Sequence, residues 1–274
     1  MTEICHESNA SVPPPHAVNP DGATVALVGN PNTGKTTLFN KLTGLRAKTA
    51  NFPGITVDLR SGRVKLPSGY VKVVDLPGLY SLQAVSPEEQ VTVNALAGDL
   101  AENPVPDVVV LVLDATNLER NLVLASEVLD LRLPTVVALN QSDAARVADI
   151  RIDVSQLSDE LKCQVVPVSA RTGEGLDSLR LIVDETLSGK LPILAQDHQS
   201  CTVGCTGCTF AARFDWAERV SSDNIQVPPT QGRRTDAIDR VLTKPVVGVA
   251  AFMSIMLVVF YLIFSLANIP IDMV

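Results

Sequence analysis

The sequence carries no surplus of positive charge. Its 22 Lys and Arg are outnumbered by 30 Asp and Glu, which gives a formal charge of −8 and a pI near 4.9. Such a chain has no extended basic surface for phosphate backbones, so we expect no nucleic-acid partner. Residues 1–22 also lack the apolar core of a secretory signal and are rich in Pro, Ser and Asn. They predict a disordered leader, followed by a domain that begins in the cytosol.

A phosphate-binding loop is the clearest positive feature. Ala23 to Val28 is an apolar run typical of a buried strand, Thr37 to Leu45 predicts a helix, and the residues between them fit G-x-x-x-x-G-K-S/T. In such a loop, backbone N–H groups and the helix N-terminus surround the phosphates, Lys35 contacts the outer phosphates and the Thr36 hydroxyl binds Mg²⁺. A chance Gly-rich turn is the alternative, and it leaves the flanking strand and helix unexplained. The predicted nucleotide-binding residues are Gly29, Asn30, Pro31, Asn32, Thr33, Gly34, Lys35, Thr36 and Thr37.

A second apolar run, Val71 to Val74, ends in Asp75-Leu76-Pro77-Gly78. The Asp75 carboxylate can hold Mg²⁺ through water and the Gly78 N–H can bond the γ-phosphate, so that hydrolysis releases the segment behind it. A lone D-x-x-G is more often an ordinary exit from a strand. Here it lies about 40 residues after the phosphate loop, which is the spacing of P-loop switch proteins.

The segment Asn51 to Asp58 lies between these motifs, and its Pro and Gly predict a loop. Thr56 is the favoured second hydroxyl ligand of Mg²⁺ when the γ-phosphate is bound, because a strand-like run resumes directly after it. Thr49 is the alternative. The predicted nucleotide contacts of this loop are Gly54, Ile55, Thr56, Val57 and Asp58.

Two further motifs predict a guanine site. Asn140-Gln141-Ser142-Asp143 and Ser169-Ala170 each follow an apolar run, and we expect nucleotide contacts from Asn140, Gln141, Asp143, Ser169 and Ala170. Asp143 can accept hydrogen bonds from N1–H and the 2-amino group of guanine, a pair that adenine lacks, so GTP is favoured over ATP. The usual motif has Lys where this chain has Gln141, which predicts weaker or faster-exchanging guanine binding. A surface N-x-x-D turn is the alternative.

Apolar runs alternate with helical patterns along residues 23–188, which predicts an α/β domain with a doubly wound, mostly parallel sheet. The ligand motifs follow strand C-termini, as such sheets require. The expected strands are Ala23 to Val28, Val71 to Val74, Val108 to Leu113, Thr135 to Leu139 and Val165 to Val168. The expected helices are Thr37 to Leu45, Pro87 to Ala97, Asn117 to Leu131 and Gly175 to Leu187.

The order GNPNTGKT, NFPGITVD, DLPG, NQSD and SA resembles the G domain of the FeoB family of bacterial ferrous iron transporters. NFPGITVD and the continuation DLPGLYSL are the specific parts, and the resemblance covers residues 23–180 and, less closely, 210–274. It implies a Ras-like P-loop GTPase that binds GTP, GDP and Mg²⁺ in the cytoplasm and gates or regulates Fe²⁺ uptake across the bacterial inner membrane. A small cytosolic accessory protein and a homo-oligomer are further partners compatible with it.

The residues that would drive hydrolysis depart from the Ras pattern. Ras-like enzymes place a Gln shortly after the D-x-x-G glycine, whereas Leu79, Tyr80 and Ser81 follow it here. Hydrolysis must then be slow, or water must be oriented by backbone groups and an added cation. The family resemblance implies that Asn32 helps to coordinate K⁺ and that the GTPase is stimulated by potassium; a turn residue with an unusual backbone angle is the alternative for Asn32. The predicted catalytic residues are Asn32, Lys35, Thr56 and Gly78.

Residues 245–269 contain no charged side chain and predict a transmembrane helix, with a core of 22 residues from Val246 to Ala267. A buried core helix is the alternative, but it would usually show a polar face. Basic residues precede the helix (Arg233, Arg234, Arg240 and Lys244) and only Asp272 follows, which predicts a cytoplasmic location for everything before it. One span cannot form an ion path, so we expect residues 270–274 to end a fragment of a multi-pass protein, or the chain to act as a tethered switch.

His198, Cys201, Cys205 and Cys208 form H-x₂-C-x₃-C-x₂-C. Such soft ligands in a cytosolic segment favour Zn²⁺, Fe²⁺ or an iron–sulfur cluster over disulfides, and a flexible reduced loop is the alternative. The cluster lies in a short linker, residues 189–244, where the FeoB family has a larger helical domain, and iron sensing is the resulting hypothesis. Two other functions stay open: a membrane-tethered regulatory GTPase without transport, and a soluble ribosome-assembly or tRNA-modification GTPase, whose basic appendage is absent.

Overall fold

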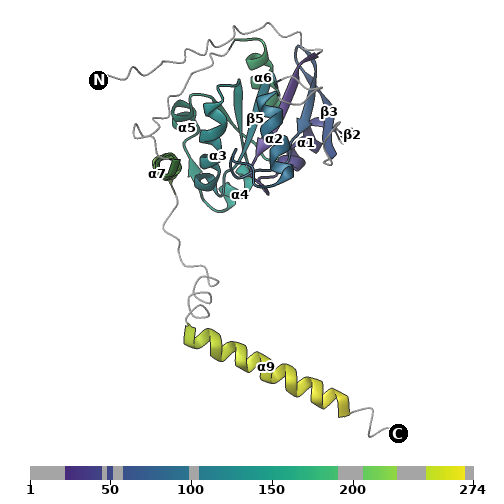
Figure 1. Cartoon of the computed structure of the whole chain (residues 1–274), viewed down its shortest axis with the longest axis vertical. Coiled ribbons are helices and arrows are strands. Elements are labelled where there is room, and N and C mark those ends of the chain that lie inside the picture. Colours follow the sequence, from purple (N-terminus) through teal and green to yellow (C-terminus); the bar gives the residue numbers. More distant parts are fainter. Residues whose placement is uncertain are drawn as a thin grey trace, which may run out of the picture. The chain divides into compact units, whose positions relative to one another are not determined.

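The computed structural model describes residues 22–44, 48–51, 58–98, 105–190, 206–226 and 245–268 (Figure 1). The chain divides into two units at residue 226, and the first of them holds the whole sheet and its covering helices.

A seven-stranded sheet in the order β2-β3-β4-β1-β5-β6-β8 forms the centre of the first unit. Its parallel part consists of β4 (Gly69–Asp75), β1 (Thr24–Gly29), β5 (Val108–Asp114), β6 (Thr135–Asn140) and β8 (Gln164–Pro167). At one edge, β3 (Asp58–Leu66) and β2 (Lys48–Asn51) run antiparallel to their neighbours. The sheet is therefore mostly parallel, as predicted.

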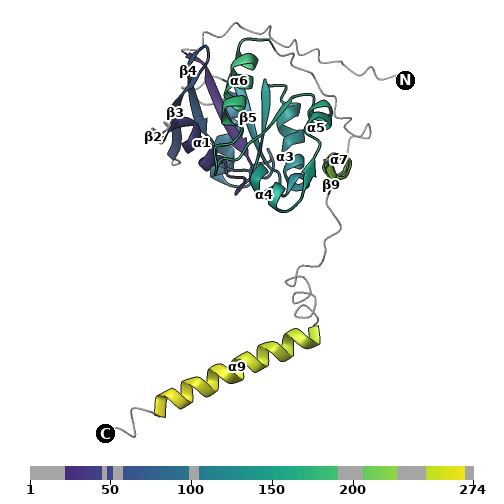
Figure 2. The ribbon, with the colours of Figure 1, turned by 180° about the vertical axis from the view of Figure 1, so that it is seen from behind.

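Helices cover both faces of the sheet, as Figures 1 and 2 show from opposite sides. α1 (Lys35–Thr43) and α6 (Leu176–Leu187) pack on the face that receives Val25 and Leu27 of β1. α2 (Pro87–Ala97), α3 (Leu118–Asp130) and α5 (Val154–Leu161) pack on the face that receives Ala26 and Val28. Because successive side chains of a strand point to opposite faces, the uninterrupted apolar runs of β1 and β5 are those of strands buried on both sides.

The five strands and four helices predicted from the sequence are all present, with ends within two residues of the predicted ones. Capping explains the best match, α2, because the Ser86 hydroxyl accepts from the Glu89 N–H, the Glu89 carboxylate accepts from the Ser86 N–H, and Pro87 is the first helical residue. Six further elements were not among the predicted strands and helices, although a strand-like run was noted after Thr56, where β3 begins. They are β2, β3, α4 (Ser142–Val147), β7 (Arg151–Ile152), α7 (Thr206–Asn224) and β9 (Ile225–Gln226).

α7 lies within the sequence range that we assigned to the linker, and its second half packs against the core of the first unit. Ala217 and Val220 are buried in the core cluster that includes α3. The Arg213 guanidinium donates to the Ser126 hydroxyl (2.9 Å) and to the Asp130 carboxylate (2.6 Å), both on α3. β9 then pairs with β7, so the described residues 206–226 belong structurally with the first unit (Figure 2).

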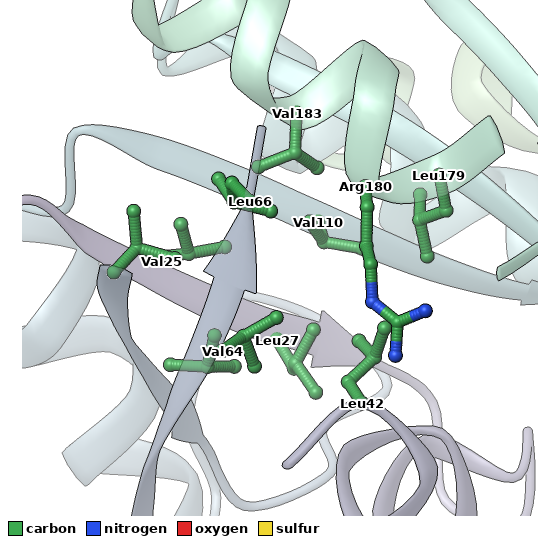
Figure 3. Close-up of a pocket in the computed structure, with 11 residues that line it drawn as sticks. Val25, Leu27, Leu42, Val64, Leu66, Val110, Leu179, Arg180 and Val183 are labelled. Atoms are coloured by element: carbon green, nitrogen blue, oxygen red, sulfur yellow. The ribbon is translucent and has the colours of Figure 1, made fainter. Parts of the chain in front are cut away.

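A small cavity remains under α6, lined by aliphatic side chains of the sheet and of α1 together with Arg180 (Figure 3). The Arg180 guanidinium pairs with Asp177 of the same helix at 2.7 Å. None of the predicted nucleotide contacts lines this cavity. We therefore attribute it to imperfect packing between α6 and the sheet.

The second unit contains α9 (Pro245–Asn268). Within it, Val247–Ser265 has a mean hydropathy of 2.6, and its large apolar side chains are exposed. A 24-residue helix spans about 36 Å at 1.5 Å per residue, so its length and composition suit a bilayer crossing. This helix matches the predicted span 245–269 except for its last residue, which lies outside the described part.

Candidate nucleotide site

The phosphate-binding loop leads from β1 directly into α1, at the point where β1 has β4 on one side and β5 on the other. Such a point of reversed strand order is where ligands bind in open α/β sheets. Gly34 occupies the left-handed region (φ 81°) and immediately precedes α1. A Cβ at residue 34 would lie 2.4 Å from the Asn140 Nδ2 atom, so glycine is required both for the backbone angle and for this close approach.

Lys35, Thr36 and Asp75 meet at the end of the loop. The Lys35 Nζ lies 3.4 Å from Asp75 Oδ1, and the Thr36 hydroxyl donates to Asp75 Oδ2 at 2.9 Å. Lys35 and Asp75 are buried, and Asp75 Oδ1 accepts no hydrogen bond from the described residues. The buried carboxylate oxygen accepts no hydrogen bond within the described part of the chain and lies beside a hydroxyl. Together they form a set of oxygen ligands that fits Mg²⁺.

The D-x-x-G segment lies against the phosphate-binding loop. A Cβ at Gly78 would come within 3.0–3.2 Å of Pro31 backbone atoms, and the Leu79 N–H donates to the Gly29 carbonyl at 3.4 Å. On its other side, the buried Thr92 hydroxyl of α2 donates to the Pro77 carbonyl at 2.9 Å. Glycine at 78 thus allows the segment to approach closely enough for its backbone to share a ligand with the phosphate-binding loop.

The continuation of that segment is held by α3. The buried Glu127 carboxylate accepts from the Leu82 N–H (2.5 Å) and from the Ser81 hydroxyl (3.1 Å). The Arg120 guanidinium lies 4.9 Å from the centroid of the Tyr80 ring. Sequence analysis missed Glu127 and Arg120, because nothing in the local sequence of α3 indicates which residues face the D-x-x-G segment.

Asn140 joins the phosphate-binding loop to the Ser169-Ala170 loop. Its Nδ2 donates to the Thr33 carbonyl at 2.7 Å, and its Oδ1 accepts from the Ala170 N–H at 2.9 Å. The side chain is 2% exposed. Both amide atoms are thus bonded to backbone groups, and Asn140 aligns the phosphate and base sides of the site.

Asp143 lies beside the Ser169-Ala170 loop and is bonded by Arg171. Arg171 donates to Asp143 Oδ2 from Nε (3.0 Å) and from Nη2 (2.6 Å). A hydrogen bond from the Ser169 hydroxyl, and next the Arg171 guanidinium, lower the pKa of the Asp143 carboxyl below its ordinary value. The carboxylate is therefore ionised at neutral pH, which the predicted acceptance of guanine N–H groups requires.

Gln141, which stands where related motifs have Lys, adopts a left-handed backbone (φ 62°). Its Nε2 donates to Asp114 Oδ2 at 2.7 Å, and Asp114 Oδ1 accepts from the Thr116 N–H at 2.8 Å. Asp114 ends β5 at the same edge as the other motifs, a position that could have indicated it. Arg171 could likewise have been noted, because it directly follows Ser169-Ala170.

Several predicted site residues either lie away from the contacts described above or fall outside the described part of the chain. Asn32 is exposed, with φ 67°, at the tip of the phosphate-binding loop. Gly54, Ile55, Thr56 and Val57 fall outside the described residues, while Asp58 begins β3 and Thr49 lies in β2. His198, Cys201 and Cys205 are also outside them, and Cys208 lies in α7. Among the residues that the structure describes, no group of three His, Cys, Asp or Glu side chains is placed to hold a metal.

Comparison with known proteins identifies this arrangement. The family model described as Ferrous iron transport protein B matches residues 23–183, more than half of the chain. The Fe(2+) transporter FeoB of Salmonella typhimurium is 44% identical over 166 residues, which are 59% of this chain and 21% of that protein. The chain thus matches about a fifth of the length of this relative.

Solved structures agree with the family match. The cytosolic domain of L. pneumophila FeoB is 28% identical, with a TM-score of 0.64, and the comparison covers 74% of this chain and all of that one. The cytosolic domain of T. maritima FeoB in its GMPPNP form is 26% identical, with a TM-score of 0.63, covering 74% of this chain and 99% of that one. The chain therefore belongs to the FeoB family of ferrous iron transport proteins, and its first unit has the fold of their cytosolic G domain.

Proposed function

We propose that this chain is the GTP-binding and GTP-hydrolysing part of a ferrous iron transporter, whose nucleotide cycle gates or regulates Fe²⁺ uptake across a bacterial inner membrane. The observation that carries the proposal is the meeting of Lys35, Thr36 and Asp75 at the sheet edge, with the D-x-x-G glycine packed beside them. That constellation suits a triphosphate with Mg²⁺, and the family match supplies the transported ion.

Each contact that a GTP and Mg²⁺ site needs has a candidate residue in this chain. The Lys35 ammonium would bind the outer phosphate oxygens, while the Thr36 hydroxyl and, through water, the Asp75 carboxylate would hold Mg²⁺. Thr56 would add a second hydroxyl when the γ-phosphate is present. The ionised Asp143 carboxylate would accept from N1–H and the 2-amino group of guanine, which ATP cannot provide. GDP in place of GTP would free the Gly78 backbone and, with it, the segment that Glu127 holds.

Potassium stimulation is the finer part of the proposal. Leu79, Tyr80 and Ser81 directly follow Gly78, so the position that holds the water-orienting glutamine of Ras-like enzymes has none here. The exposed Asn32 side chain at the loop tip would offer an amide oxygen to K⁺, which supplies positive charge near the developing phosphate charge. Steady-state hydrolysis in KCl and NaCl tests this: Asn32→Ala should abolish the difference between the two salts, and a difference that survives would contradict the role.

The metal-binding role of His198, Cys201, Cys205 and Cys208 stays a proposal that rests on residue type and spacing. The purified double variant Cys201→Ser, Cys205→Ser should lose its bound zinc or iron, measured by inductively coupled plasma mass spectrometry. Unchanged metal content would remove the sensing hypothesis.

Transport itself is tested in cells that lack their own ferrous transporter. These cells should take up radiolabelled Fe²⁺ when they carry the complete reading frame, and Lys35→Ala should abolish the uptake. Lys190→Ala, which removes an exposed lysine beyond the end of α6 and away from the site, is the matched control and should leave uptake intact. If the wild type reaches the membrane but supports no uptake, the tethered regulatory GTPase becomes the better account.

A further inference from the structure

The carboxylate proposed to recognise guanine is already in an ion pair. Arg171 places two N–H donors on Asp143 Oδ2, at 2.6 and 3.0 Å, and the Asp143 side chain is only 14% exposed. Gln141, which replaces the usual Lys of the guanine motif, is bonded to Asp114 and not to Asp143 in this structure. Arg171, whose side chain is 79% exposed, therefore bonds Asp143 from the solvent-exposed side.

Guanine and Arg171 need the same acceptor. The base presents N1–H and the 2-amino group side by side, and recognition uses both carboxylate oxygens. A guanidinium is likewise a planar donor that suits a carboxylate. Since Asp143 Oδ2 holds both Arg171 bonds, a base in its recognition position would displace the guanidinium.

We infer that Arg171 is a latch that competes with the guanine base for Asp143 and thereby weakens guanine-nucleotide binding and speeds its release. The inference rests on the proposed function, because it takes Asp143 as the guanine-binding residue. The ion pair is weak because the Arg171 side chain is 79% exposed. When the guanidinium leaves Asp143, it returns to water at little cost in free energy. Competition of this strength should change affinity by a small factor and leave the site usable.

The direction of the effect distinguishes a latch from ordinary electrostatics. Removing a positive charge close to an anionic nucleotide should weaken binding through the long-range field. Removing a competitor should instead tighten it. Tighter binding after loss of Arg171 is thus a result that a merely attractive or structural role would not give.

The test measures the Kd and the dissociation rate of a fluorescent GDP derivative with the full chain in detergent micelles. Arg171→Ala should lower the Kd roughly two- to fivefold and slow dissociation. Arg171→Lys keeps the charge but loses the fork of donors, so it should fall between wild type and Ala. Arg146→Ala is the matched control, because it breaks an exposed ion pair (Arg146–Glu174, 2.7 Å) that tethers the same loop without bonding Asp143. Because Arg146→Ala removes a nearby positive charge without freeing Asp143, its Kd should not fall and should stay at or slightly above the wild-type value.

A second background separates the latch from indirect effects. In Asp143→Asn the carboxylate is gone, and xanthine becomes the complementary base. There, Arg171→Ala should no longer tighten binding of the xanthosine diphosphate probe. An unchanged or raised Kd for GDP in Arg171→Ala, or equal tightening in the Asn background, would overturn the latch. Failure of the wild type to bind GDP at all would instead refute the proposed function.

Discussion

Asn140→Ala should be among the most damaging single changes at the site, for reasons that are visible in the fold. The Asn140 amide donates to the Thr33 carbonyl and accepts from the Ala170 N–H, at 2.7 and 2.9 Å, and is 2% exposed. Alanine would remove both amide atoms at once. The Thr33 carbonyl and the Ala170 N–H would then be buried without a hydrogen-bond partner. Each such loss costs about 1–3 kcal/mol. With about 1–2 kcal/mol for each of the two groups, we expect the free energy of unfolding to fall by about 2–4 kcal/mol.

Thermal unfolding of the full chain in micelles measures this loss. The fluorescence of Trp216, the single tryptophan, reports on the packing of α7 against the core. For a domain of roughly 200 residues, the expected loss corresponds to a fall in Tm of about 5–15 °C. Asn94→Ala is the control, because its amide accepts from exposed Gln90 of the same helix, and it should shift stability by less than about 0.5 kcal/mol.

The two loops that Asn140 joins should also move apart. GDP should therefore raise the Tm of Asn140→Ala much less than that of the wild type, because a weaker ligand stabilises less at the same concentration. A loss below about 1 kcal/mol, with the full GDP-induced shift retained, would refute the claim that this amide organises the site.

Three further predictions concern residues around the site. Glu127→Gln should raise amide exchange at Leu82 in hydrogen-exchange mass spectrometry, because a neutral amide accepts less strongly than a carboxylate; unchanged exchange would contradict the anchor. Arg213→Ala should lower the free energy of unfolding by about 1–2 kcal/mol through loss of the half-buried pair with Asp130, measured by denaturant titration, and an unaltered midpoint would contradict α7 docking. Burial raises the pKa of the Cys163 thiol to about 12, so iodoacetamide at pH 8.5 should modify it in urea but not in the native chain; because the unfolded thiol ionises first, the protein should also lose stability as pH rises above that thiol's ordinary pKa.

The central strands could be predicted because strands that are buried on both faces have uninterrupted apolar sequences. β1, β5 and β6 are short runs of Val, Leu and Ala, and Gly and Asp or Asn follow where the chain turns out of the sheet. β3 was anticipated only as a strand-like run after Thr56, without bounds, because charged residues such as Arg60, Arg63 and Lys65 alternate with others along it. Its place depends on pairing with β4, which no local pattern encodes.

The candidate site divides in the same way. Lys35, Thr36 and Asp75 could be predicted because the phosphate-binding chemistry fixes their residue types at fixed spacings. Contacts such as Glu127 to Leu82, between residues 45 positions apart, depend on how α3 packs beside the D-x-x-G segment. The predicted nucleotide contact of Asn140 stays a prediction, while the bonds of its amide to backbone groups of two loops are a role that only the fold reveals.

Nucleotide specificity tests the central claim most directly. Binding of fluorescent guanosine, adenosine and xanthosine diphosphates should be measured for the wild type and for Asp143→Asn. The wild type should bind the guanosine form and not the adenosine form, and Asp143→Asn should transfer the preference to xanthosine, since an amide at residue 143 complements that base. Equal binding of adenosine diphosphate by the wild type, or an unchanged guanine preference in Asp143→Asn, would contradict a guanine site at this edge of the sheet.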